Sequence, residues 1–212
     1  MTALDSIRLA DQQHIVLAGV SWETYEQILR DLQDRPIRVT YDKGNLEMMA
    51  PLASHEEWKS RYGRLIEVMC EERDLDVEPL GSTTFRREDL EKGIEPDECY
   101  YVQYAEAIRA RRGREIDLTV DPPPDLVIEI DITRTSIPKE PIYAALGIPE
   151  IWRLNGTRLT VLRLRDGKYH AAETSGVFSF LPMERFQQFI LRLASERQPQ
   201  VLREFRNWVK TL

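Results

Sequence analysis

The chain has 212 residues, 42% hydrophobic and 31% charged, and its 36 acidic and 29 basic residues give a formal net charge of −7. This globular composition allows one domain with a substantial core, whereas the acidic balance disfavours a protein that coats nucleic acid nonspecifically. No run approaches the roughly 20 apolar residues of a membrane helix. The N-terminus lacks a secretory signal, and the two cysteines are too few for a disulfide framework, so we expect a cytoplasmic protein without membrane partners.

The N-terminal quarter predicts an arm, a helix and a hairpin. Residues 1–14 show no hydrophobic periodicity, and we expect them to form a loose arm. Ser21 is a typical N-cap, and the helix after it should run to about Asp34. Two short apolar segments around a Gly-Asn turn then predict a hairpin over residues 37–49.

A second helix should begin at Ser54. Ser54 and Glu57 match the S-x-x-E capping box that opens many helices. Apolar residues then recur at helical spacing and predict a buried face: Trp58, Tyr62, Leu65, Ile66 and Met69. His55 lies near this face at the start of the helix, either as a capping or core histidine or as a side chain at an active site.

The middle of the chain predicts short strands and a basic segment. Strands are expected over residues 77–80, 83–85 and 94–102, and the third carries Asp97 after Pro96. Residues 105–114 predict a helix followed by a loop. This segment holds the one dense basic run, whose side chains are either solvated or the best local candidates for phosphate contacts: Arg109, Arg111, Arg112 and Arg114.

Residues 125–132 form the strongest predicted strand. Side chains alternate across a strand, so Leu126, Ile128 and Ile130 should share one face. The other face then carries the acidic groups: Asp125, Glu129 and Asp131 beside Val127. Carboxylates gathered in this way indicate either a solvated face or a bound cation.

The remaining chain completes a mixed α/β domain. A short helix is expected over residues 141–146, followed by strands over 150–154, 158–164 and 168–172 and a C-terminal helix over 184–212. With no linker long enough to separate domains, residues 1–212 should form a single domain around a central mixed sheet.

Three residues of this domain suggest chemistry. Asp97 lies 32 residues before Glu129, and the two carboxylates meet if their strands are neighbours. Carboxylates with open positions between them are how proteins hold Mg²⁺ for phosphoryl chemistry. Lys139 follows Glu129 by ten residues and is either a surface lysine or an ammonium group beside the carboxylates.

Several segments carry a family resemblance: SWETYEQIL, VTYDKGNLEMMAPLASHE, the Pro96-Asp97 pair, PPPDLVIEIDIT and KEPIYAALGIPEIWRL. Over roughly residues 20–165 the chain resembles the Uma family of restriction-endonuclease-like proteins. The resemblance implies a PD-(D/E)xK nuclease core, a mixed sheet flanked by helices, with the hairpin and first helix as an N-terminal extension. One strand of this core carries the first acid, and the next carries an E-x-K pair.

The resemblance assigns roles residue by residue. Asp97 matches the first acid and Glu129 the second, whereas Asp131 occupies the usual lysine position. Lys139 stands four residues before Tyr143, as a later lysine does in the family, and would replace the missing one. Many relatives carry an aspartate four residues before that lysine, where this chain has Thr135, and His55 matches a helix-start position.

Together these matches imply a DNA endonuclease that uses Mg²⁺ or Mn²⁺, and we expect a homodimer because cutting both strands of a duplex is simplest with two active sites. Asp97, Glu129 and the Ile130 carbonyl would hold the metal, Asp131 would add a ligand, and Lys139 would orient the attacking water. His55 and Glu56 would support these groups, and Arg111 and Arg112 would contact DNA.

Two alternatives stay open. The substitution at Asp131 favours a catalytically inactive nuclease-fold module that binds nucleic acid or a protein partner. A purely structural acidic sheet predicts instead that Asp97, Glu129 and Lys139 lie far apart.

Overall fold

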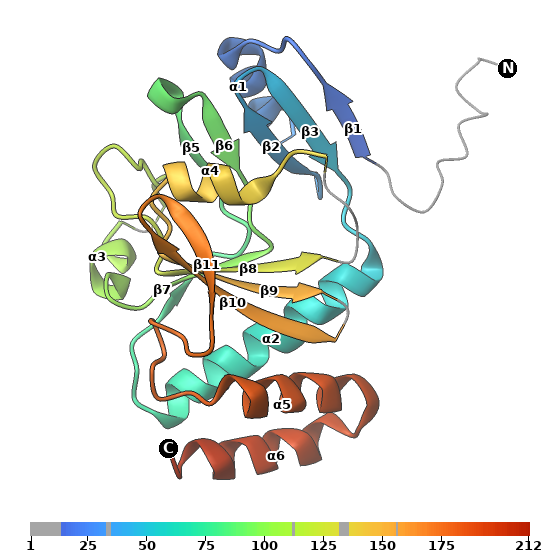
Figure 1. The fold of residues 1–212 in the computed structure, drawn as a ribbon, viewed down its shortest axis with the longest axis vertical. Helices are drawn as coiled ribbons and strands as arrows, with labels where there is room; N and C mark the ends of the chain where they lie inside the picture. The colour runs from blue at the N-terminus through green and yellow to red at the C-terminus, as the bar shows by residue number, and fades with distance from the viewer. Residues whose placement is uncertain (1–13, 33–34, 112, 132–135, 156) are drawn as a thin grey trace, which may run out of the picture.

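The computed structural model describes residues 14–32, 35–111, 113–131, 136–155 and 157–212. Its elements, drawn in Figure 1, are β1 (His14–Leu17), α1 (Trp22–Asp31), β2 (Arg38–Asp42), β3 (Asn45–Met49), α2 (Ala53–Glu72), β4 (Glu78–Pro79), β5 (Phe85–Arg87), β6 (Lys92–Ile94), β7 (Glu98–Tyr101), α3 (Ala105–Arg109), β8 (Leu126–Asp131), α4 (Lys139–Ala145), β9 (Glu150–Asn155), β10 (Arg158–Arg165), β11 (Lys168–Ala172), α5 (Met183–Ser195) and α6 (Gln198–Val209). No described helix is both long and apolar enough to cross a membrane.

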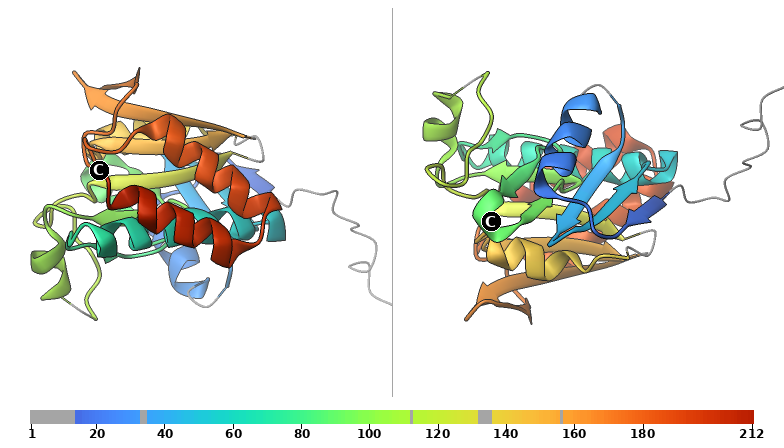
Figure 2. Two further views of the ribbon diagram at one scale, coloured as in Figure 1. Left: turned by 90° about the horizontal axis from the view of Figure 1, so that it is seen from below. Right: turned by 90° about the horizontal axis from the view of Figure 1, so that it is seen from above.

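The strands form two sheets. The larger has six strands in the order β11-β10-β9-β8-β7-β4 and is mixed, because β8 and β9 are parallel while the other neighbours are antiparallel. The smaller has five antiparallel strands in the order β1-β3-β2-β6-β5. Helices α2, α5 and α6 lie side by side on one face of the larger sheet, as Figure 2 shows from below. Helix α4 lies on the other face and contacts β6 of the smaller sheet, so the predicted mixed α/β class is confirmed.

Strand β8 crosses the middle of the core. Leu126, Ile128 and Ile130 pack into the cluster beneath α2, α5 and α6, as the alternation predicted. Val127 packs on the opposite face, in the cluster that includes α4. Because both faces are covered, Glu129 is only 1% exposed, and the interpretation of its face as solvated is wrong.

The first predicted elements are confirmed with small shifts. Oγ of Ser21 accepts a hydrogen bond from the Thr24 N–H, but α1 ends at Asp31, three residues early. The hairpin β2–β3 turns at Lys43 and Gly44, both with positive φ. It is more than an extension, because its strands form the centre of the smaller sheet.

The start of the second helix differs from the prediction. Helix α2 begins at Ala53 with Leu52 as N-cap and no side-chain cap, so Ser54 lies inside the first turn and the capping box is wrong. A cap must precede the helix, where its backbone is extended, and that position belongs to Leu52. The arm predicted for residues 1–14 lies outside the described residues except for His14, which begins the edge strand β1.

The single strand predicted over residues 94–102 is two strands in different sheets. β6 ends at Ile94 in the smaller sheet, and β7 begins at Glu98 in the larger one. Pro96 lies between them and has no N–H to donate to a strand ladder. Asp97 therefore stands where the chain crosses between the sheets.

The C-terminal region is also divided. The helix expected over 184–212 is α5 and α6, separated by Glu196 and Arg197. Pro199 lies in the first turn of α6, where it is tolerated, although it would disrupt the interior of one continuous helix. The break lets both apolar faces pack on the core, with Phe189 and Phe205 in edge-to-face contact at 5.1 Å. The predicted short helix is α4, which begins two residues earlier than expected, and the three predicted strands are β9, β10 and β11.

Candidate active site

Strand pairing brings Asp97 beside Glu129. β7 runs antiparallel to β8 with Glu98 opposite Ile128, so the residue before β7 falls next to Glu129. Lys139 is the first residue of α4 and reaches the same place, with its Nζ 2.5 Å from Oε2 of Glu129. The three residues therefore cluster, and the interpretation in which they lie far apart is wrong.

Asp97 is a buried carboxylate with one free oxygen. Its side chain is 1% exposed, and its Oδ2 accepts a hydrogen bond from the Ile130 N–H at 2.7 Å and lies 3.1 Å from Nε2 of His55. Its Oδ1 is buried and has no hydrogen-bond partner among the described residues. Burial alone would raise the pKa of Asp97, but the His55 hydrogen bond and the Lys139 charge hold it below its ordinary value.

Glu129 is held from two positions on α4. Lys139 contacts Oε2, and the Tyr143 hydroxyl donates a hydrogen bond to Oε1. Burial raises the pKa of Glu129 to about 7, although the Lys139 charge opposes the rise. Burial would lower the pKa of Lys139, but the charges of Glu129 and Asp97 outweigh it, so the lysine stays an ammonium ion at neutral pH.

His55 and Glu56 lie in the first turn of α2, as predicted. His55 is buried, and its bond to Asp97 raises its pKa in spite of burial. Glu56 is half-exposed, with Oε1 3.5 Å from Nη2 of Arg38 and 3.9 Å from Nδ1 of His55. His55 thus acts directly on the Asp97 carboxylate, whereas Glu56 reaches the site only through His55.

Asp131 is matched by a cation from the neighbouring strand. Nε of Arg153 on β9 lies 3.1 Å from Oδ2 of Asp131. Nη1 of Arg153 also donates to Glu140 of α4 at 2.7 Å. Burial raises the pKa of Asp131 while Arg153 opposes the rise. Where the motif would carry a lysine, this chain has an acid–arginine pair, and the ammonium beside Glu129 comes from Lys139.

The structure does not bring the predicted basic run to this cluster. Arg111 pairs with the buried Asp121, and Arg109 pairs with Asp76 and Glu78. Helix α3 follows β7 and so lies beyond the start of β8, away from its Asp131 end (Figure 1). Arg112 lies outside the described residues.

Three neighbours of the cluster were not predicted to be functional: Glu47, Tyr143 and Arg153. Tyr143 follows Lys139 by one helical turn, and that spacing could have shown that both face Glu129. Glu47 of β3 is buried and accepts hydrogen bonds from the N–H groups of Ser136 and Ile137 at 3.1 and 3.0 Å. It ties the smaller sheet to the segment that leads to Lys139, a pairing across 89 residues that no local pattern signals.

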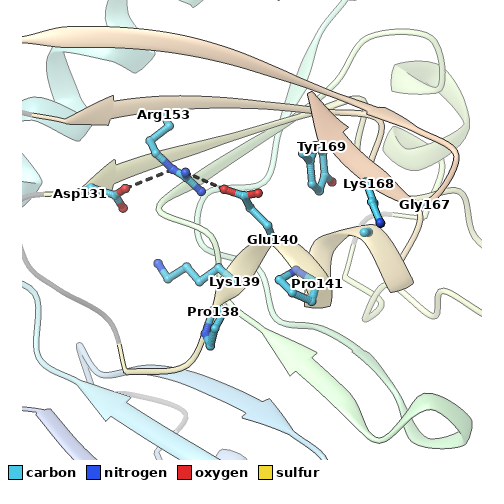
Figure 3. A pocket seen from close by; sticks show the side chains of 10 residues that line it. Asp131, Pro138, Lys139, Glu140, Pro141, Arg153, Gly167, Lys168 and Tyr169 are labelled. Carbon is cyan, nitrogen blue, oxygen red and sulfur yellow. Dashed lines mark hydrogen bonds and ion pairs between the residues drawn. The ribbon is translucent and has the colours of Figure 1, made fainter. Parts of the chain in front are cut away.

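A pocket of about 720 Å³ adjoins the cluster (Figure 3). Helix α4 forms one wall, and β9 and the β10–β11 turn form the other. Its polar and charged lining comes from Asp131, Lys139, Glu140, Arg153, Lys168 and Tyr169. Lys139 therefore faces both the carboxylates and a space large enough for a small ligand.

The chemistry open to this arrangement is set by oxygen donors and one ammonium group. No three His, Cys, Asp or Glu side chains surround a common point in the described part of the chain. A metal ion would therefore depend on Asp97, Glu129 and a main-chain oxygen. The main-chain oxygen that the family resemblance names is that of Ile130, whose N–H donates to Asp97.

Comparison with protein families gives one match. A family model described as Uma2, putative restriction endonuclease, matches residues 22–194. The match spans both sheets and contains Asp97, Glu129 and Lys139. No curated protein matches the chain.

Proposed function

The chain belongs to the Uma2 family, described as putative restriction endonucleases, and we propose that it is an endonuclease that uses Mg²⁺ or Mn²⁺ to hydrolyse DNA phosphodiester bonds. The observation that carries this proposal is the free Oδ1 of Asp97, buried next to the Glu129–Lys139 pair. A buried carboxylate oxygen without a partner costs about 1–3 kcal/mol, and a bound cation would remove that cost.

The donor set fits a hard divalent cation. Asp97, Glu129 and the Ile130 carbonyl offer only oxygen, the donor that Mg²⁺ and Mn²⁺ prefer. When bound, the metal would polarise a phosphoryl oxygen and lower the pKa of its water. Glu129 must lose its proton to take part, and its pKa of about 7 places that change near neutral pH.

Side chains of the protein would orient the attacking water, stabilise the developing charge and position the carboxylates. Lys139 keeps its charge and would orient the attacking water and stabilise the negative charge that develops on the phosphate. The hydrogen bond from Tyr143 would fix the Glu129 carboxylate, and that of His55 would fix the Asp97 carboxylate. Both carboxylates would then be oriented before the substrate binds.

The test is cleavage of varied DNA substrates with Mg²⁺ or Mn²⁺. We expect Glu129→Ala and Glu129→Gln to lose on the order of a thousandfold or more in rate while circular dichroism shows an intact fold. Glu115→Gln serves as the control, because that glutamate side chain is 75% exposed. Cleavage by Glu129→Ala at the wild-type rate would contradict the proposal.

A second candidate is a module that binds nucleic acid or protein without cleaving it. The Asp131–Arg153 pair at the usual lysine position favours it. An ion that binds the folded protein stabilises it and raises its melting temperature. A divalent ion that raises the melting temperature of the wild type but not of Asp97→Ala therefore supports the enzyme, because the ion would then depend on the Asp97 carboxylate. No rise in either protein supports the binding module.

The homodimer stays a prediction. Cutting both strands of a duplex is simplest with two active sites, and sedimentation of the protein with and without DNA measures whether two copies associate.

A further inference from the structure

The pocket beside Lys139 has the features of a nucleotide site. Figure 3 shows Asp131 and Lys139 toward one end and Lys168 and Tyr169 toward the other. Its volume of about 720 Å³ lies within the roughly 300–1,000 Å³ typical of small-ligand sites. That space admits one nucleotide unit and is far too small for a base-paired segment.

The pocket gathers cationic side chains in a chain that is acidic overall. Its lining holds three basic residues, Lys139, Arg153 and Lys168, against two acidic ones, Asp131 and Glu140. The whole chain carries −7. Lys139 is paired with Glu129, and Arg153 is paired with Asp131 and Glu140, whereas Lys168 is in no ion pair among the described residues. Lys168 is therefore the cation of this pocket that is most available to attract a phosphate group.

Arg153 has donors left for a ligand. Its Nε faces Asp131 and its Nη1 faces Glu140, which fixes the plane of the guanidinium. A guanidinium carries five N–H donors, so these two ion pairs leave others able to reach a phosphate oxygen. Lys168 is exposed on β11 and can approach the same anion.

Tyr169 supplies a fixed aromatic ring. Its hydroxyl donates to the main-chain oxygen of Ile148 at 2.6 Å, which anchors the ring while it lines the pocket. Bases of any sequence stack on such rings.

We propose that this pocket binds one unpaired nucleotide of the substrate strand next to the cleaved phosphate. Tyr169 stacks on the base, and Arg153 and Lys168 contact its phosphate. A base stacked on Tyr169 is not stacked in a duplex, so the substrate class is DNA with an unpaired nucleotide at the cleavage position. This inference rests on the proposed nuclease function.

The experiment measures binding separately from cleavage. Fluorescein-labelled 12-nucleotide DNA, single-stranded or fully paired with its complement, is titrated with the full chain in EDTA, and anisotropy is read at several salt concentrations. The variants are Tyr169→Leu, Tyr169→Phe and Lys168→Ala. Tyr104→Leu is the matched control, because Tyr104 is 45% exposed and lies at α3 outside the pocket.

We expect the single strand to bind more tightly than the duplex. Tyr169→Leu should weaken single-strand binding about tenfold, whereas Tyr169→Phe, which keeps the ring, and Tyr104→Leu should bind as the wild type does. Lys168→Ala should reduce the slope of log K against log salt by about 0.7, the loss of one phosphate contact. Since Lys168 is exposed, this variant keeps its fold even if Tyr169→Leu does not.

Two results would overturn the inference: wild-type affinity in both Tyr169→Leu and Lys168→Ala, or a duplex bound as tightly as the single strand. Either can occur while Glu129→Ala still abolishes cleavage, which would leave the nuclease proposal standing. Conversely, undiminished cleavage by Glu129→Ala would remove the nuclease proposal whatever the pocket binds.

Discussion

Replacing Lys139 by methionine tests the electrostatics of the buried pair. The substitution keeps most of the side-chain volume but removes the ammonium that lies 2.5 Å from Oε2 of Glu129. The pKa of Glu129 is already about 7 because of burial, and the Lys139 charge opposes that rise. Without the charge we expect the pKa of Glu129 to rise further, toward the upper end of the roughly 8–9 documented for buried glutamates.

The magnitude follows from the difference in bound protons. Between pH 7 and 9 the Glu129 carboxyl of the folded variant would keep a proton that the folded wild type loses. In the unfolded state Glu129 is ionised in both proteins over this range, so the unfolded chains do not differ at this group. The variant's free energy of unfolding should therefore fall relative to wild type by at most about 1.4 kcal/mol per pH unit, and by about 2 kcal/mol over the range because each group is half-titrated at one end of it. Below pH 6 both folded proteins hold the proton, and the difference between them should be constant.

Urea unfolding followed by tryptophan fluorescence at pH 6, 7, 8 and 9, in EDTA, measures this trend. Lys168→Met is the control, because Lys168 is exposed and lines the same pocket without contacting Glu129. A difference between Lys139→Met and wild type that is the same at pH 6 and pH 9 would refute the reasoning, because Lys139 would then not control the ionisation of Glu129.

Three further predictions concern neighbouring parts of the molecule. Tyr143→Phe removes a hydrogen bond that lowers the pKa of Glu129, so the acidic limb of the cleavage–pH profile should move to higher pH, and an unchanged profile would count against this role. Glu47→Ala leaves the buried N–H of Ile137 without its acceptor, which should cost about 1–3 kcal/mol in urea titrations and lower kcat more than it raises KM. Equal effects on kcat and KM would argue against a positioning role for Glu47. Phe205→Ala opens a cavity between α6 and the core and should cost about 3–5 kcal/mol in the same titrations, and a loss below 1 kcal/mol would mean that α6 is peripheral.

Much of the fold was readable from local patterns. The alternation in residues 125–132 predicted which side chains of β8 face each core cluster, and Ser21 predicted the start of α1. The strands predicted over residues 158–164 and 168–172 are β10 and β11, which pair as a hairpin with positive φ at Asp166 and Gly167. These signals depend on residues within one or two turns of each other, so the sequence displays them directly.

The predictions that were wrong share one cause, because each depended on packing between elements that a local sequence pattern does not display. The apparent strand around Asp97 is divided because its two halves pair in different sheets, and the C-terminal helix is divided because both pieces bury an apolar face on the core. The solvated face predicted for Glu129 is covered by α4, which is placed by contacts with β6 and β11. Several of these contacts join distant parts of the chain, such as β6 with β2 and α4 with β6.

The candidate site shows the same division. The sequence by itself determined which residues are candidates for the chemistry, because the carboxylates of Asp97 and Glu129 and the lysine at 139 can be read in it directly. Only the tertiary structure decided that Asp97 keeps a free buried oxygen, that Glu129 is held by Lys139 and Tyr143, and that Arg153 neutralises Asp131. The residue types are a property of the chain, whereas burial and the distances between charges, which set the pKa values of these groups, arise only when the strands pair and α4 packs against them.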